Sequence, residues 1–176
     1  MLDWLLKLIG GKDEIDIAED RMKEDAKDPL HARVHGLLLI SEPADPGHRP
    51  DFANQAVREW YGCADRAAVL QKIEMFAASA EGYDVFRATF LARAAAGAGL
   101  LSPEESWSLC QRTLATAQRN FATWQDYGDA YIRGHLWYRR TQGDDEATLA
   151  GYEQNLRKTM MELQTKGVWS RVTLLG

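Results

Sequence analysis

Asp84 and Arg87 are the residues of this sequence whose placement is chemically most unusual. They stand three positions apart at the start of YDVFRATFLARAAAG, a segment that is otherwise mostly apolar. A buried charge without a partner is costly, so such residues are either paired for structure or retained for function. One interpretation makes Asp84 a first-turn acid and Arg87 its ion-pair partner or an outward-reaching cation. The other interpretation places both in a functional site.

A second concentration of chemistry is FATWQDYGDAYIRGHLW, residues 121–137. At about 100° per residue, Trp124, Tyr131 and His135 lie within one arc of the predicted helix. An aromatic face of this kind is typical of a helix that packs inside a bundle, and we expect it to pack on the helix that carries Trp107. His135 is then a buried imidazole with a hydrogen-bonded neighbour. On the opposite, polar face, an ion pair is predicted between residues 129 and 133.

The alternative for the aromatic face is a ligand pocket. In such a pocket Arg87 holds an anionic group, His135 exchanges a proton, and aromatic rings stack on the ligand. The hypothesis requires Arg87 and His135 to border one cavity. The candidate pocket or interaction residues are Asp84, Arg87, Trp107, Trp124, Tyr131 and His135.

The sequence predicts no metal site and no cofactor. His31 and His35 in HARVH have the spacing of zinc ligands, but the glutamate of HExxH is replaced and no third ligand lies nearby in the sequence, so we interpret both as surface or packing residues. Cys63 and Cys110 lack CxxC spacing and further cysteine partners, which predicts reduced thiols. We find no phosphate-binding glycine loop after a strand and no nucleophile elbow.

Helices must position these residues, and the predicted fold class is all-α. In SPEES, Ser102 predicts an N-cap, Pro103 suits the first helical position and Glu105 completes a capping box. Thr123 and Asp144 are predicted caps of the last two long helices. Because no two alternating segments are available to pair as strands, we expect a single compact domain of roughly eight or nine helices.

Proline and glycine predict the remaining boundaries. Pro29 opens one helix, and SEPADPGHRP is the clearest loop of the chain. Asp51 is predicted to cap the helix that follows this loop. Gly82 and Gly167 are expected to end the helices that precede them. The loop divides the sequence into an N-terminal helical arm, residues 1–50, and a helical body, residues 51–176.

Composition narrows the class of protein. The chain has 176 residues, of which 45% are hydrophobic and 27% charged, as expected for one globular domain that needs no disulfide or metal for stability. The formal net charge is −5, with 21 basic against 26 acidic residues. That balance argues against a nucleic-acid partner, because phosphate binding relies on clustered lysine and arginine.

The N-terminal stretch MLDWLLKLIGG is apolar but much shorter than the roughly twenty residues of a membrane span. It also lacks the features of a secretory signal, so we expect a cytoplasmic protein. Its predicted role is packing or docking on a partner, and a weaker alternative places residues 1–10 at a membrane surface. The docking residues are Leu2, Trp4, Leu5, Leu8 and Ile9.

The segments YDVFRATFLARAAAGAGLLSPEESW and FATWQDYGDAYIRGHLWY together resemble a bacterial domain of unknown function, family number twelve-sixty-six, found in YbeU and YbeR proteins. The resemblance runs from about residue 54 to 139 and is densest at 83–139. It implies a bacterial accessory protein without an assigned enzymatic activity or cofactor. Residues 1–50 have no counterpart in this resemblance.

Two functions follow as hypotheses. The leading one is a non-catalytic protein that binds another protein, such as an immunity, adaptor or accessory protein of a toxin or secretion system. It is motivated by the acidic helical body, the lack of a catalytic motif and the apolar N-terminal segment. The alternative is a small-molecule-binding protein or hydrolytic enzyme that uses the pocket of Asp84, Arg87 and His135.

Overall fold

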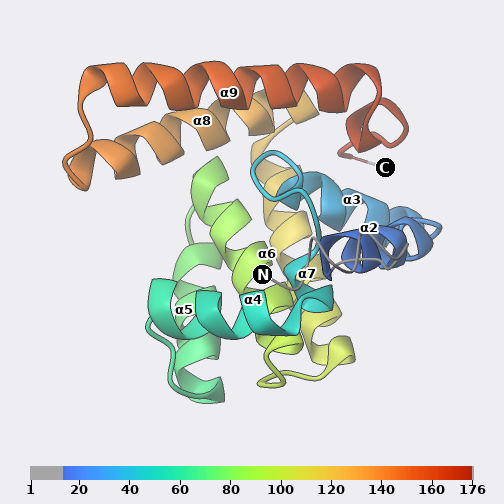
Figure 1. Ribbon diagram of the computed structural model, residues 1–176. Coiled ribbons are helices and arrows are strands. Elements are labelled where there is room, and N and C mark those ends of the chain that lie inside the picture. The colour runs from blue at the N-terminus through green and yellow to red at the C-terminus, as the bar shows by residue number, and fades with distance from the viewer. Residues whose placement is uncertain (1–13, 176) are drawn as a thin grey trace, which may run out of the picture.

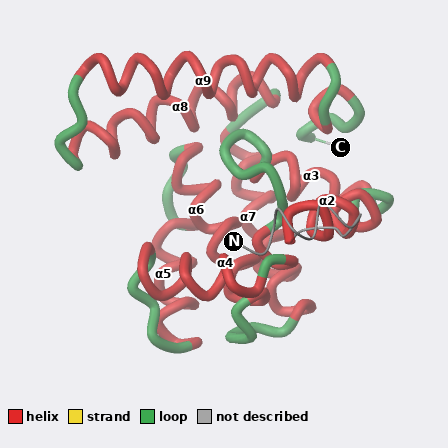
Figure 2. The backbone as a smooth tube through the Cα atoms, viewed as in Figure 1, coloured by secondary structure: helices red, strands yellow, loops and turns green. Residues whose placement is uncertain are grey.

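The computed structural model describes residues 14–175, and this range is all-α as predicted, with eight α-helices and no strand (Figures 1 and 2). Within it, no helix combines the length and apolar character that crossing a membrane requires. The docking residues predicted in residues 1–10 lie outside the described range. The α-helices are α2 (Glu14–Asp25), α3 (Pro29–Leu38), α4 (Pro50–Gln55), α5 (Arg66–Ala77), α6 (Gly82–Gly97), α7 (Pro103–Asn120), α8 (Trp124–Thr141) and α9 (Glu146–Thr165). Short elements are the 3-10 helices η1 (Pro46–His48) and η3 (Val168–Ser170) and the π-helix η2 (Ala56–Trp60).

Helix α6 is the centre of the fold, as its nearly continuous apolar sequence predicts. It contacts α3, α4, α5, α7 and α8. Ala88, Ala92 and Ala95 are fully buried along it. Their small side chains allow several neighbouring helices to approach one axis closely.

Helix α8 packs chiefly on α6 and α9, which corrects the predicted contact with α7 (Figure 1). Two glycines explain the arrangement. Gly128 lies against the Met160 side chain of α9, and a Cβ at Gly134 would stand 2.7 Å from the Cβ of Tyr83 on α6. Both close approaches require the absence of a side chain at the glycine, so the aromatic face of α8 is shared between two neighbours.

Several predicted helix boundaries are confirmed. Ser102 and Glu105 form the capping box of α7, and the Thr123 side chain caps α8. Helix α9 ends at Thr165, just before Gly167. These boundaries rest on local side-chain hydrogen bonds and glycine, which sequence spacing reveals directly.

Two predicted caps are wrong. Asp145, not Asp144, caps α9, because Asp144 forms an ion pair with Arg139 Nε at 2.6 Å. Helix α4 begins at Pro50 after Arg49, which makes no capping bond, and Asp51 lies in the first turn. There its negative charge still faces the positive end of the helix dipole.

Two further local predictions are corrected by tertiary contacts. Gly82 begins α6 instead of ending α5, which stops at Ala77. The predicted ion pair within α8 is replaced by one between helices: Asp129 accepts a hydrogen bond from Arg157 of α9 at 3.2 Å, and not from Arg133.

The described part of the N-terminal arm shares the hydrophobic core of the body. Its contributions to that core are Val34, Leu37, Leu38 and Ile40. The end of the chain closes over α3, where the Trp169 indole N–H donates to the Gly36 carbonyl at 2.8 Å. The sequence division at the proline-rich loop therefore does not separate two cores.

Candidate functional site

A cavity of about 300 Å³ lies between α6, α8 and the segments that flank η2 and follow α3. Arg87 and His135 both border it, which is the arrangement that the pocket hypothesis required. Its size falls at the lower end of small-molecule sites. Its polar and charged lining includes Glu42, Tyr61, Arg87, Tyr131, His135 and Arg139.

Arg87 is held at the cavity edge by aromatic rings and one carboxylate. Its guanidinium carbon lies 3.9 Å from the ring centre of Phe76 and 5.4 Å from those of Tyr83 and Tyr138. Its Nη1 donates to Asp84 Oδ1 at 3.2 Å, and both side chains are about a quarter exposed. A guanidinium has several further N–H donors, so Arg87 keeps the capacity to bind an anion while the rings fix its position.

Two cavity-lining polar atoms have no hydrogen-bond partner within residues 14–175. They are Nδ1 of His135 and the hydroxyl of Tyr131, a fully buried residue that has the Ser41 side chain nearby but makes no hydrogen bond of ordinary geometry to it. The interpretation of His135 as a packing histidine required such a partner, and the described structure does not supply one. Burial lowers the pKa of His135, so its imidazole is neutral at neutral pH. Buried polar atoms are normally paired, which makes these two candidates for contact with a ligand.

Glu42 adds a group that titrates near neutral pH. Burial raises the pKa of its carboxyl to about 7, against the attraction of the Arg49 charge. The Arg49 Nη1 donates to Glu42 Oε1 at 2.7 Å. The cavity therefore contains one carboxyl that can accept or donate a hydrogen bond near neutral pH.

A second, larger hollow of about 570 Å³ lies beside the first. The two hollows share Tyr83, Arg87 and Tyr138, so these three residues lie at the boundary between them. Trp137 borders the larger one and is 66% exposed. Asp84 borders this second hollow and not the first. It is linked to the first hollow only through its hydrogen bond with Arg87.

The other two predicted site residues lie elsewhere. Trp107 is stacked on His31 at 3.7 Å between ring centres and lies under the Arg93 guanidinium at 3.8 Å. Trp124 is stacked on Trp169 at 5.2 Å. His31 is thus a packing residue, as interpreted. The structure brings Arg87, Tyr131 and His135 to one cavity but neither tryptophan.

Sequence reasoning missed a buried ionic cluster centred on Asp45. Both carboxylate oxygens of this fully buried residue accept from Arg93 Nε, and His35 Nε2 lies 3.2 Å from Oδ2. Asp45 lies in the loop treated as a connector, and Arg93 in the helix considered mainly apolar. An arginine in the middle of such a helix was the available signal, since a buried guanidinium requires a carboxylate partner.

Comparison with known proteins agrees with the resemblance. The sequence model of the family described as "Protein of unknown function (DUF1266)" matches residues 11–173. The chain belongs to the DUF1266 family. This DUF1266 match is wider than the predicted likeness over residues 54–139, and it includes most of the N-terminal arm and the loop that carries Asp45. Neither the curated proteins nor the solved structures contain a match to the chain.

Proposed function

We propose that this DUF1266 chain binds a small organic anion with a planar body in the cavity shared by Arg87 and His135. The observation that carries the proposal is the convergence of the Arg87 guanidinium with two buried polar atoms that make no hydrogen bond of ordinary geometry, Tyr131 Oη and His135 Nδ1. The guanidinium suits a carboxylate or phosphate, and the surrounding rings suit a flat apolar body.

Binding, rather than hydrolysis, is the form of activity that we propose. Hydrolysis through a serine, threonine or cysteine nucleophile requires that side chain to be hydrogen-bonded to a base. Within residues 14–175, no hydrogen bond joins His135 to a serine, threonine or cysteine. A neutral imidazole beside a tyrosine hydroxyl instead offers a hydrogen-bond donor and acceptor for a polar group of the ligand.

The test uses isothermal titration with two probes, 4-hydroxyphenylacetate and phenyl phosphate, after a thermal-shift comparison of both. We expect saturable binding of at least one probe at one site per chain. Arg87→Gln is expected to weaken binding at least tenfold, because it removes the charge that holds the anion. The matched control is Arg112→Ala, which removes an arginine from an exposed ion pair with Glu74.

The proposal fails if neither probe binds the wild type, or if Arg87→Gln and Arg112→Ala bind equally well. A circular dichroism melt of each variant guards against a loss that is due to unfolding. Tyr131→Phe provides a second readout, since it removes one proposed ligand contact without removing a hydrogen bond of ordinary geometry within the protein.

Protein binding is a second proposal, supported by the exposed tryptophans at the two hollows. Trp60 and Trp137 are 57% and 66% exposed, and tryptophan is enriched among residues that dominate binding energy. A bacterial, cytoplasmic setting and a toxin- or secretion-related partner belong to this proposal. A pulldown from native lysate supports it only if Trp137→Ala loses a partner that the wild type and Arg112→Ala retain. Equal capture by all three proteins counts against it.

A further inference from the structure

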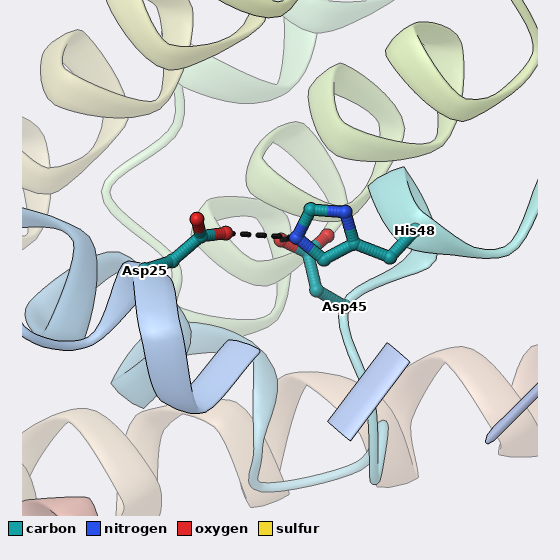
Figure 3. Close-up of side chains that lie close together, drawn as sticks. All are labelled: Asp25, Asp45 and His48. Carbon is teal, nitrogen blue, oxygen red and sulfur yellow. Dashed lines mark hydrogen bonds and ion pairs between the residues drawn. The ribbon is translucent and has the colours of Figure 1, made fainter. Parts of the chain in front are cut away.

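Four potential metal ligands from separate segments meet beside the first two helices. Asp25 ends α2, His35 belongs to α3, Asp45 lies in the loop, and His48 ends η1. Figure 3 shows the side chains of Asp25 and His48 reaching toward each other, with Asp45 beside them. Sequence spacing could not reveal this cluster, because the HARVH pair supplies only His35 and the other ligands come from elsewhere.

The close contacts within this cluster join the Nε2 atoms of the two histidines to one oxygen, Oδ2, of each aspartate. His35 Nε2 lies 3.2 Å from Asp45 Oδ2 and 4.0 Å from Asp25 Oδ2. His48 Nε2 lies 2.8 Å from Asp25 Oδ2 and 4.0 Å from Asp45 Oδ2. Each imidazole nitrogen therefore faces both carboxylate oxygens, in a closed alternating ring. The ligand atoms of Asp25, Asp45 and His48 all lie within 4.8 Å of one another.

The four histidine-to-carboxylate separations can be compared with those of a tetrahedral transition-metal ion; His35 lies beside, and not within, the set of three whose ligand atoms all lie within 4.8 Å of one another. With zinc–ligand bonds of about 2.0–2.2 Å, the ligand atoms of a tetrahedral site stand about 3.3–3.6 Å apart. The separations of 2.8 to 4.0 Å lie on both sides of that range. Two imidazoles and two carboxylates are a ligand set that zinc accepts, whereas calcium and magnesium prefer oxygen alone.

Charge also favours a cation here. Arg93 pairs with Asp45, whereas the ion-pair contacts of Asp25 go to the two histidines. Within residues 14–175, Asp25 has no ion pair with a lysine or arginine, and a bound cation would supply a positive partner. The surroundings resemble the outer shell of a metal centre, since Arg93 Nε and the Gly47 amide donate to the Asp45 carboxylate and fix its orientation.

We propose that Asp25, His35, Asp45 and His48 together bind one divalent transition-metal ion, for which zinc has the best-fitting geometry. The ion reaches the site from the side of Asp25 and His48, whose side chains are 26% and 17% exposed, while Asp45 and His35 are buried. Its binding ties the end of α2 to the loop and α3. The site is separate from the Arg87 cavity, so either proposal can fail without the other.

The experiment uses the full chain without an affinity tag, freed of metal by a chelator and titrated with Zn²⁺ or Co²⁺ alone. We expect one ion per chain by isothermal titration, and the intense visible absorption of four-coordinate cobalt. His48→Ala and Asp25→Asn are chosen because they alter the two partly exposed ligands. Each is expected to weaken binding at least tenfold and to abolish the four-coordinate cobalt spectrum.

His31→Ala is the matched control. His31 lies in α3, as His35 does, but its ring stacks on Trp107 and lies outside the cluster. Circular dichroism of the metal-free variants establishes that they are folded. Failure to bind either ion, or equal binding by His48→Ala and His31→Ala, overturns the proposal. An NMR titration in which His48 gains a proton well above its ordinary pKa, without metal binding, identifies a network of ion pairs instead.

Discussion

Both oxygens of the Asp45 carboxylate accept a hydrogen bond from Arg93 Nε, at 3.1 and 2.9 Å, although the two residues are 48 positions apart. Asp45 is fully buried and Arg93 is 3% exposed. The pair fastens the loop after α3 to the central helix, so its removal has a large and specific expected effect.

Asp45→Asn is expected to destabilise the protein by about 3–5 kcal/mol, because it leaves the buried Arg93 charge without a compensating charge. Urea unfolding followed by circular dichroism, in the presence of a chelator, measures the change. Combining Asp45→Asn with Arg93→Met should cost less than the sum of the single changes. Additive costs would contradict this pairing, and Arg112→Ala, which breaks an exposed pair, should cost at most about 1 kcal/mol.

The raised pKa of Glu42 predicts that the protein loses stability as the pH rises from about 4.5 to 7. The pKa of this carboxyl is raised to about 7 from 4.5, so the folded state binds the proton more tightly than the unfolded state. The associated stability is complete below the unfolded pKa and is lost as pH rises through the folded pKa. The stability of Glu42→Gln relative to the wild type should therefore rise between pH 4.5 and 8, by on the order of 3 kcal/mol. Urea unfolding across this range tests it, with the exposed Glu146→Gln as a flat control.

Two tyrosines of α8 should respond oppositely to the same substitution. Tyr127 Oη donates to the Leu37 carbonyl at 2.7 Å, so Tyr127→Phe is expected to cost about 1 kcal/mol. Tyr131 Oη makes no hydrogen bond of ordinary geometry in the described structure, although Ser41 is nearby, and Tyr131→Phe is expected to leave stability unchanged or higher. Thermal unfolding compares them. A clear destabilisation by Tyr131→Phe would reveal a bond to a group outside the described residues or to water.

Replacing either of two helical glycines with alanine should change the stability of the protein in opposite directions. A Cβ at Gly82 would meet the backbone of α8, with the Tyr131 nitrogen at 2.5 Å, so Gly82→Ala forces the helices apart and should cost about 1–3 kcal/mol. Gly151 lies within α9 and has no atom within 4 Å of an added Cβ. Gly151→Ala should therefore stabilise the protein by about 0.5–1 kcal/mol. Chemical denaturation measures both, and equal effects would refute the close α6–α8 approach.

Local signals in the sequence were sufficient for the fold class and for several boundaries. The capping box at Ser102 and the cap at Thr123 depend on residues within one helical turn, so spacing alone identifies them. The choice between Asp144 and Asp145 depended on Arg139, a tertiary partner for one of them. The packing of α8 likewise depended on what lies opposite Gly128 and Gly134, which periodicity does not encode.

The candidate site was predictable only in part, for the same reason. Arg87 and His135 could be singled out as polar residues on apolar faces, and they do share a cavity. Glu42 could not, because its raised pKa depends on burial in the folded protein. Asp45 and His48 were hidden in a proline-rich loop, a composition that favours exposed connectors although Asp45 here is fully buried.

The bond from Trp169 to the Gly36 carbonyl spans 133 positions and has a consequence for synthesis on the ribosome. Helix α3 is made early, but the indole that covers it emerges only after on the order of ten seconds of further translation. During that interval the apolar residues of α3 lack part of their cover, and they are open to chaperones or to neighbouring nascent chains. The order of synthesis thus exposes early a surface that the finished protein keeps closed.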